Sequence, residues 1–122
     1  HTSVEALSCI QIAKESGFDN ITIDLIYGLP NQSTKNWEEN LAQMLELDIQ
    51  HFSAYSLTVE SKTKLKHLID KKIIKPLDEK VTVEHFNTLL DIASKNNFIH
   101  PTLASGFTNI YRALDVNIII AA

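Results

Sequence analysis

Residues 20–32, Asn20-Ile-Thr-Ile-Asp-Leu-Ile-Tyr-Gly-Leu-Pro-Asn-Gln32, carry the clearest structural signal in the chain. A run of apolar and β-branched residues contains one acid, Asp24, and ends at a Gly-Leu-Pro turn. Short apolar runs bounded by Gly and Pro are typical of buried parallel strands. A carboxylate inside such a strand is costly to bury unless hydrogen-bond donors satisfy it. Asp24 therefore predicts either donors supplied by the protein or donors supplied by a ligand.

The alternation along this strand separates its side chains into two sets, because successive residues point to opposite faces of a sheet. One set, Ile21, Ile23 and Leu25, suits packing under helices. The other set mixes polar and apolar residues, which suits a barrel interior or a ligand crevice; it consists of Thr22, Asp24 and Ile26.

A second strand is predicted over residues 51–57. If Phe52 and Ala54 pack under helices, Ser53 and Tyr55 lie on the same face as Asp24. His51, at the start of this strand, is interpreted as a surface residue, because barrel chemistry lies at the opposite strand ends.

Helices are predicted around both strands from apolar spacing and caps. A capping box opens the first helix, over residues 4–15, Gly17 ends it, and Cys9 lies on its apolar stripe as core. A second helix is predicted after the cap Thr34, and a short third helix over about residues 65–71. A fourth is predicted from the cap Asp78 to about residue 96. In the last helix the predicted stripe is Val83, Phe86, Leu90 and Ala93.

Two further strands are predicted, one beginning at Asn97 and a candidate last one over residues 116–120. Regular alternation of helices and strands predicts an α/β fold whose parallel strands are joined by right-handed crossovers. A partial (β/α) barrel and a small doubly wound sheet both fit this order.

The composition indicates one domain or part of one, with 122 residues and a hydrophobic fraction of 44%. A net charge of −4 argues against a nucleic-acid partner. No apolar run is long enough to cross a bilayer. The single cysteine excludes an internal disulfide and a multi-cysteine metal cage within these residues, and fits a cytoplasmic setting. Because the sequence begins without Met and finishes on an apolar run, we expect an excised fragment.

The string Gly17-Phe-Asp-Asn-Ile-Thr-Ile-Asp-Leu-Ile-Tyr-Gly-Leu-Pro-Asn-Gln32 resembles the middle of radical SAM proteins of the oxygen-independent coproporphyrinogen III oxidase family. It is most similar to the coproporphyrinogen oxidase-like branch associated with haem chaperones. Trp37-Glu-Glu39 and His51-Phe-Ser-Ala-Tyr-Ser-Leu-Thr58 support the resemblance. It covers about residues 1–100, interpreted as the central part of a radical SAM barrel domain. Residues 101–122 depart from the family pattern and form a tail of uncertain assignment.

The resemblance implies a partial TIM-like barrel that holds a 4Fe–4S cluster and S-adenosylmethionine (SAM). By this resemblance Asp24 contacts the ribose hydroxyls, Ile26 lines the adenine site, Tyr55 lies near the adenine and Thr58 contributes backbone contacts. An ionised carboxylate only accepts hydrogen bonds, so two ribose hydroxyls would satisfy Asp24 well. The alternative is a purely structural Asp24 within an unrelated α/β module.

The implied activity of the full-length protein is oxidative decarboxylation of coproporphyrinogen III by a radical SAM oxidoreductase. The alternative is a haem-binding chaperone with vestigial SAM chemistry, so the expected partner is a porphyrinogen or haem. The Cys-x-x-x-Cys-x-x-Cys loop that ligates the cluster is absent from this sequence. We therefore expect the chain alone to be inactive, to bind neither cluster nor SAM, and to self-associate through exposed strand edges.

Overall fold

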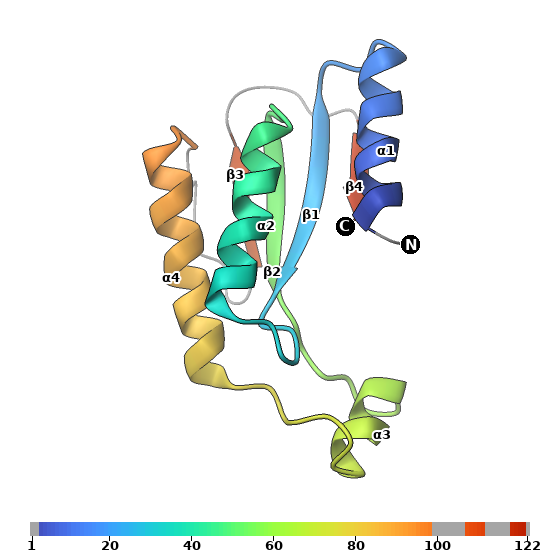
Figure 1. Ribbon diagram of the computed structural model, residues 1–122, viewed down its shortest axis with the longest axis vertical. Helices are drawn as coiled ribbons and strands as arrows, with labels where there is room; N and C mark the ends of the chain where they lie inside the picture. The colour runs from blue at the N-terminus through green and yellow to red at the C-terminus, as the bar shows by residue number, and fades with distance from the viewer. Residues whose placement is uncertain (1–2, 99–106, 112–117, 122) are drawn as a thin grey trace.

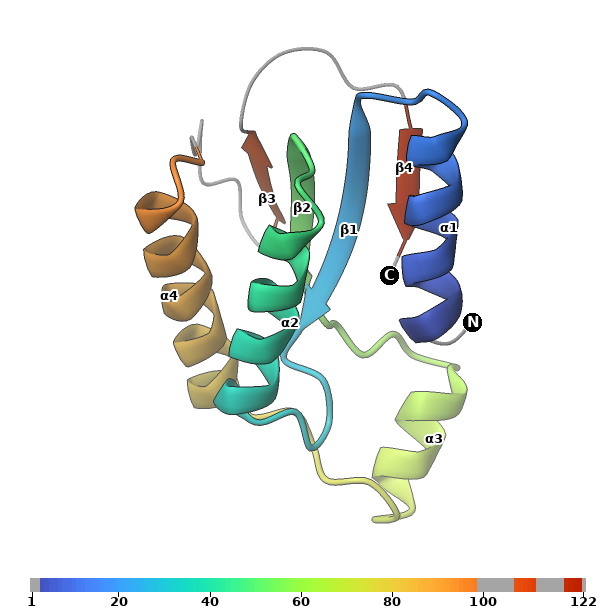
Figure 2. The ribbon, with the colours of Figure 1, turned by 45° about the horizontal axis from the view of Figure 1, so that its top comes forward.

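The computed structural model describes residues 3–98, 107–111 and 118–121 (Figure 1). Four strands form one sheet in the order β3-β2-β1-β4. Figures 1 and 2 show α1, α2 and α4 on the same side of this sheet, whereas α3 lies beyond the carboxyl ends of β1 and β2. The elements are α1 (Ser3–Glu15), β1 (Ile21–Tyr27), α2 (Thr34–Glu46), β2 (His51–Ser56), α3 (Lys64–Asp70), α4 (Glu79–Lys95), β3 (Phe107–Tyr111) and β4 (Ile118–Ala121).

The sheet is mixed, with parallel strands at its centre. β1 pairs in parallel with both β2 and β4, but β3 runs antiparallel to β2. The prediction of parallel strands is therefore correct for β1, β2 and β4, whereas the antiparallel β3 lies where no strand was predicted. The chain is a mixed α/β fold.

The strand predicted from Asn97 is wrong in the two residues that the structure describes. Asn97 has a φ of 61°, outside the β region, and Phe98 is buried. The Phe98 ring packs edge-on against Phe52, with ring centroids 5.1 Å apart. This contact places Phe98 in the core rather than in a ladder. Ile99 and His100 lie outside the described residues, as do positions 116 and 117 of the predicted last strand, which is found as β4.

The hydrophobic core lies between the helices and the face of β1 that was predicted to pack under them. Ile21 and Ile23 are each 1% exposed, and Phe52 of β2 is fully buried. Trp37 of α2 packs against Tyr27, with ring centroids 5.5 Å apart. The other large core residues are Ile10, Leu25, Leu41, Met44, Ile49, Leu89 and Phe98.

The helix ends follow local sequence signals. Gly17 ends α1, as predicted: it adopts a φ of 90°, and the Phe18 amide donates to the Ala13 carbonyl at 3.2 Å in a Schellman arrangement. Asp78 caps α4, as predicted, by accepting from the Lys80 amide at 2.9 Å. α2 is capped by Ser33 rather than Thr34, because Ser33 and Asn36 form a reciprocal capping box.

Three burial predictions are wrong. Cys9 is exposed, because the buried stripe of α1 is centred on Ile10 and Cys9 lies a quarter-turn outside it. His51 is buried, only 7% exposed. Val83 is 58% exposed, because the buried line of α4 passes instead through His85, Leu89 and Ala93.

Candidate functional site

The register between β1 and β2 brings three of the predicted site residues onto one face of the sheet. Asp24 pairs with Ser53, and Ile26 pairs with Tyr55. Side chains alternate along a strand, so these four residues lie on the face opposite the helices. The sequence alternation predicted this arrangement, and the register confirms it. We call this set, together with Thr22 and His51, the Asp24 face.

The Asp24 face changes from buried to open along the strands. Thr22 is 2% exposed and His51 7%, at the amino ends. Asp24 and Tyr55 are half-buried, and Ile26 is 41% exposed near the carboxyl end of β1. Ligands of parallel α/β folds bind outside the carboxyl ends of the strands. The open end of this face is therefore where the fold favours a ligand.

Within residues 3–98, the Asp24 carboxylate accepts no hydrogen bond and forms no salt bridge. The negative charge of Asp24 acts on His51. Burial lowers the pKa of the His51 imidazole, and the Asp24 charge raises it in part. His51 Nδ1 lies 3.0 Å from Thr22 Oγ1 across the strand pair. A half-buried carboxylate without a donor can accept hydrogen bonds from a ligand.

Thr58 lies near this site but not on the Asp24 face. It follows the end of β2 and its side chain is exposed. The strand pairing extends one residue past β2, because the Leu57 amide donates to the Tyr27 carbonyl at 2.9 Å. Thr58 therefore begins the loop that follows β2 at the carboxyl edge of the sheet. It is placed there by following the strand, not by pairing with a residue of β1.

The loop after β1 is held in place by α4. Gly28 has a φ of 70°, and its amide donates to Nδ1 of His85 at 3.2 Å. A Cβ on Gly28 would lie only 2.8 Å from Thr82 Oγ1, so the backbone passes closer to α4 than a side chain would permit. The loop also closes on itself, because the Leu29 amide donates to Gln32 Oε1 at 3.2 Å.

His85 was not identified from the sequence as a site-supporting residue. It is fully buried, and burial lowers the pKa of its imidazole, while the charge of Glu84 acts in the opposite direction. The signal that could have found it is spacing: His85, Leu89 and Ala93 follow one another every four residues, which places a histidine on the buried line of α4.

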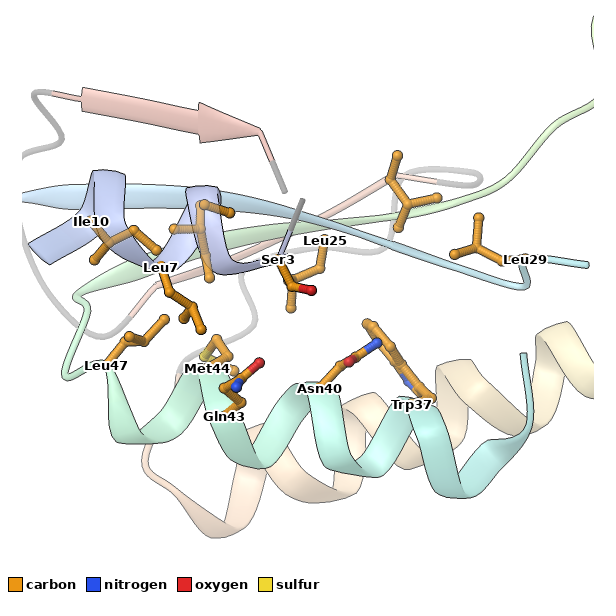
Figure 3. A pocket seen from close by; sticks show the side chains of 13 residues that line it. Ser3, Leu7, Ile10, Leu25, Leu29, Trp37, Asn40, Gln43, Met44 and Leu47 are labelled. Carbon is orange, nitrogen blue, oxygen red and sulfur yellow. The ribbon is translucent and has the colours of Figure 1, made fainter. Parts of the chain in front are cut away.

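A separate hollow lies on the helix side of the sheet, between α1, β1 and α2 (Figure 3). Its volume is about 400 Å³, and its wall is mostly apolar. Lys14 of α1 bridges to α2 beside it by donating to the carbonyl groups of Leu47 and Asp48. Ile26 of the Asp24 face also lines this hollow, together with Leu29, near the carboxyl end of β1. Among its lining residues are Leu7, Ile10, Leu25, Trp37, Met44 and Leu47.

Neither a metal site nor a membrane span is found in the part of the chain that the structure describes. Within residues 3–98, 107–111 and 118–121 no group of three or more His, Cys, Asp or Glu side chains could hold a metal ion. Over the same residues, no helix combines the length and the apolar character that crossing a membrane requires. Cys9, the one cysteine, lies exposed on α1. These residues therefore do not fit an iron–sulfur cluster.

Comparison with curated proteins gives significant matches over most of the chain. The heme chaperone HemW of Lactococcus lactis is 32% identical over 100 residues, which cover 82% of this chain and 26% of the relative. A zebrafish protein named radical S-adenosyl methionine domain-containing protein 1, mitochondrial, is 29% identical over 99 residues, 80% of this chain and 22% of the relative. The oxygen-independent coproporphyrinogen III oxidase of Helicobacter pylori is 28% identical over 90 residues, 73% of this chain and 19% of the relative.

The chain thus spans about a quarter or less of the length of these relatives. No family model and no solved structure matches it.

Proposed function

Because the chain is a homologue of the HemW heme chaperones and of radical SAM proteins that include oxygen-independent coproporphyrinogen III oxidase, we propose that it forms one wall of a SAM site. In this proposal residues 1–100 are the central part of a radical SAM barrel domain, and residues 101–122 are a tail outside the barrel pattern. The arrangement of β1, α2 and β2 is compatible with a barrel segment, since the helices cover one face and leave the Asp24 face toward the interior.

The observation that carries the proposal is the half-buried Asp24 carboxylate, which has no protein donor in residues 3–98, beside two side chains suited to a base. The two hydroxyls of a ribose are donors that match an acceptor-only carboxylate. Ile26 and Tyr55 are cross-strand neighbours at the open end of the same face, and offer apolar and aromatic contact to an adenine ring. The residues present therefore fit the adenosyl part of SAM.

The role of this chain is binding and orientation of the nucleoside. SAM and a 4Fe–4S cluster together supply the one-electron chemistry of radical SAM proteins. The ligands of that cluster do not occur among the described residues, and the chain contains one cysteine. Incubation of the 122-residue chain with iron, sulfide and SAM is expected to give neither cluster absorbance nor deoxyadenosine; either signal would contradict this division of roles.

Asp24→Asn in the full-length protein tests the binding role. The substitution keeps the shape of the side chain but replaces the carboxylate, whose two oxygens would accept hydrogen bonds from the ribose hydroxyls, by a neutral amide. Charge-assisted hydrogen bonds are worth about 1.5–3 kcal/mol, so SAM affinity is expected to fall about 10- to 100-fold. Asp19→Asn, at an exposed acid just before β1, is the matched control and should leave the affinity unchanged. Equal SAM affinities for wild type and Asp24→Asn would favour a structural Asp24.

For the whole protein, we propose a function in porphyrin or haem metabolism, with a porphyrinogen or haem as the larger partner. Oxidative decarboxylation of coproporphyrinogen III and haem binding as a chaperone are the two forms of this function. The names of the Lactococcus lactis and Helicobacter pylori relatives support one form each. Haem titration and product analysis with the full-length protein would separate them: stoichiometric haem binding without product favours the chaperone, and turnover of coproporphyrinogen favours the oxidase.

A further inference from the structure

We propose that His85 of α4 is a positioning residue for the Asp24 face, acting as a neutral acceptor that fixes the backbone of Gly28 at the carboxyl end of β1. This inference rests on the proposed function, because it assigns the support of the same site. It concerns a residue that touches no expected ligand and that lies 57 positions away from Gly28 in the sequence.

His85 connects three elements from a fully buried position. Its Nδ1 accepts the Gly28 amide at 3.2 Å, which ties α4 to the end of β1. Its backbone carbonyl accepts the indole Nε1–H of Trp37 at 2.9 Å, which ties α4 to α2. The imidazole and indole rings lie roughly stacked, with centroids 6.2 Å apart. His85 is therefore held through both its ring and its backbone.

The donor in the Gly28 contact determines the state of the imidazole. A backbone N–H can only donate, so Nδ1 must be unprotonated and the single ring proton lies on Nε2. Nε2 is buried and has no hydrogen-bond partner among the described residues. A ring with an unused buried donor is a poor choice for packing alone, since an apolar side chain would avoid that cost. The contribution specific to the histidine is its acceptor for Gly28.

A displacement of the Gly28 backbone would also move the neighbouring residues of the candidate site. Gly28 follows Tyr27, the last residue of β1, and lies two residues after Ile26 and four after Asp24. Thr82, one turn before His85, lies so close to the same glycine that a Cβ added there would be 2.8 Å from its Oγ1. α4 thus holds the end of β1 by a hydrogen bond and by close contact, and the open end of the Asp24 face lies immediately beside this hold.

A pair of substitutions separates positioning from packing. His85→Leu removes the acceptor while keeping an apolar side chain in the core. His85→Asn keeps an acceptor, because Asn Oδ1 occupies a position close to that of His Nδ1. Both are made in the 122-residue chain and in the full-length protein.

Amide hydrogen exchange in the 122-residue chain gives the first readout. In His85→Leu the protection of the Gly28 amide should fall at least tenfold more than that of Leu25, in the middle of β1. In His85→Asn it should stay within about threefold of wild type on the same relative scale. An equal loss at Gly28 and Leu25 in His85→Leu would mean a packing role and overturn the proposal.

SAM binding to the full-length protein gives the second readout. The dissociation constant should rise about tenfold in His85→Leu and return to near wild type in His85→Asn. Loss of Gly28 protection with unchanged SAM affinity would overturn the positioning role. Failure of the proposed SAM site is recognised separately, because Asp24→Asn would then leave SAM affinity unchanged, whereas the Gly28 exchange result does not depend on it.

If His85→Leu does not fold, the tautomer of the His85 imidazole in the wild-type chain tests the proposal instead. Nitrogen chemical shifts of the wild-type imidazole should report an unprotonated Nδ1 and a protonated Nε2 at neutral pH. A proton on Nδ1 would exclude the Gly28 contact and overturn the proposal.

Discussion

The two faces of the central sheet differ in what they do, although the same two strands build both. On the helix face, alternate residues of β1 and β2 are sealed against α2 and α4, and Phe52 and Ala54 are fully buried. On the Asp24 face, exposure rises along the strands from 2% at Thr22 to 41% at Ile26. Toward the carboxyl ends of the strands, the strand parity of a residue thus predicts whether its substitution changes stability or ligand binding, and adjacent residues there should behave in opposite ways.

Truncation of the core should give the largest effect. Trp37 is 1% exposed, packs on Tyr27 and donates to the His85 carbonyl, so Trp37→Ala leaves a cavity and removes this hydrogen bond. The free energy of unfolding, measured by urea titration, is expected to fall by about 3–5 kcal/mol. Ile26→Ala, on the other face, should cost less than about 1.5 kcal/mol. Similar losses for the two variants would contradict the division between the faces.

Two glycines with positive φ should respond unequally to alanine. Gly17 and Gly28 both adopt a left-handed conformation that costs an alanine about 1–2 kcal/mol. At Gly17 an added Cβ meets nothing within 4 Å, whereas at Gly28 it meets Thr82 Oγ1 at 2.8 Å. Gly28→Ala should therefore destabilise the fold by about 1–3 kcal/mol more than Gly17→Ala in thermal unfolding.

The steric effect of Thr82 can be tested by shortening its side chain. Gly28→Ala measured in a Thr82→Ala background should lose most of this excess, because the Oγ1 and Cγ2 atoms that crowd the new Cβ are removed. An excess that persists in the double variant would assign the cost to the backbone instead.

Acid should weaken the fold through one histidine on each face. Burial lowers the pKa of His51 and of His85, so the folded state keeps both neutral at pH values where the unfolded chain binds protons. The free energy of unfolding should therefore fall as the pH drops below about 6.5, by at most about 1.4 kcal/mol per pH unit for each histidine. Urea midpoints between pH 5 and 8 measure this slope.

The His85→Leu variant divides the pH dependence between the faces. It should reduce the slope below pH 6.5 and leave the part that belongs to His51, whose neighbouring carboxylate is Asp24. A slope identical to that of wild type would show that His85 does not titrate with folding.

The smallest effect on stability is expected at Asp24. Its carboxylate has no hydrogen-bond or salt-bridge partner in residues 3–98, so Asp24→Asn should change the free energy of unfolding by less than about 0.5 kcal/mol. The same variant is expected to weaken SAM binding strongly in the full-length protein. A large loss of stability would reveal a structural carboxylate, and the Asp24 face would then resemble the helix face.

The sequence was sufficient for the Asp24 face because strand alternation follows from backbone geometry alone. Once Ile21, Ile23 and Phe52 are assigned to the core, Asp24, Ile26 and Tyr55 must lie opposite. The family resemblance then suggested what that face binds, which alternation could not do.

The support of the site could not be predicted in the same way. The spacing of His85, Leu89 and Ala93 could place His85 on the buried line of α4, but it could not identify its partner, the Gly28 amide at a distant strand end. The direction of β3 is also not local, since pairing with β2 rather than the sequence of the strand determines it. Long-range contacts of this kind leave no periodic signal in the sequence.

The segment around α3 is a place where the chain can be cleaved without disrupting the core. No residue of α3 is buried, and its one side-chain ion pair among the described residues, between Lys66 and Asp70, is exposed and weakly stabilising. The core on either side is joined without it, because α4 holds β1 and α2 through His85. Trypsin should therefore cut first among the lysines at 62–75, and the nicked halves should remain associated as a split protein, which also makes this segment a natural position for an inserted reporter domain.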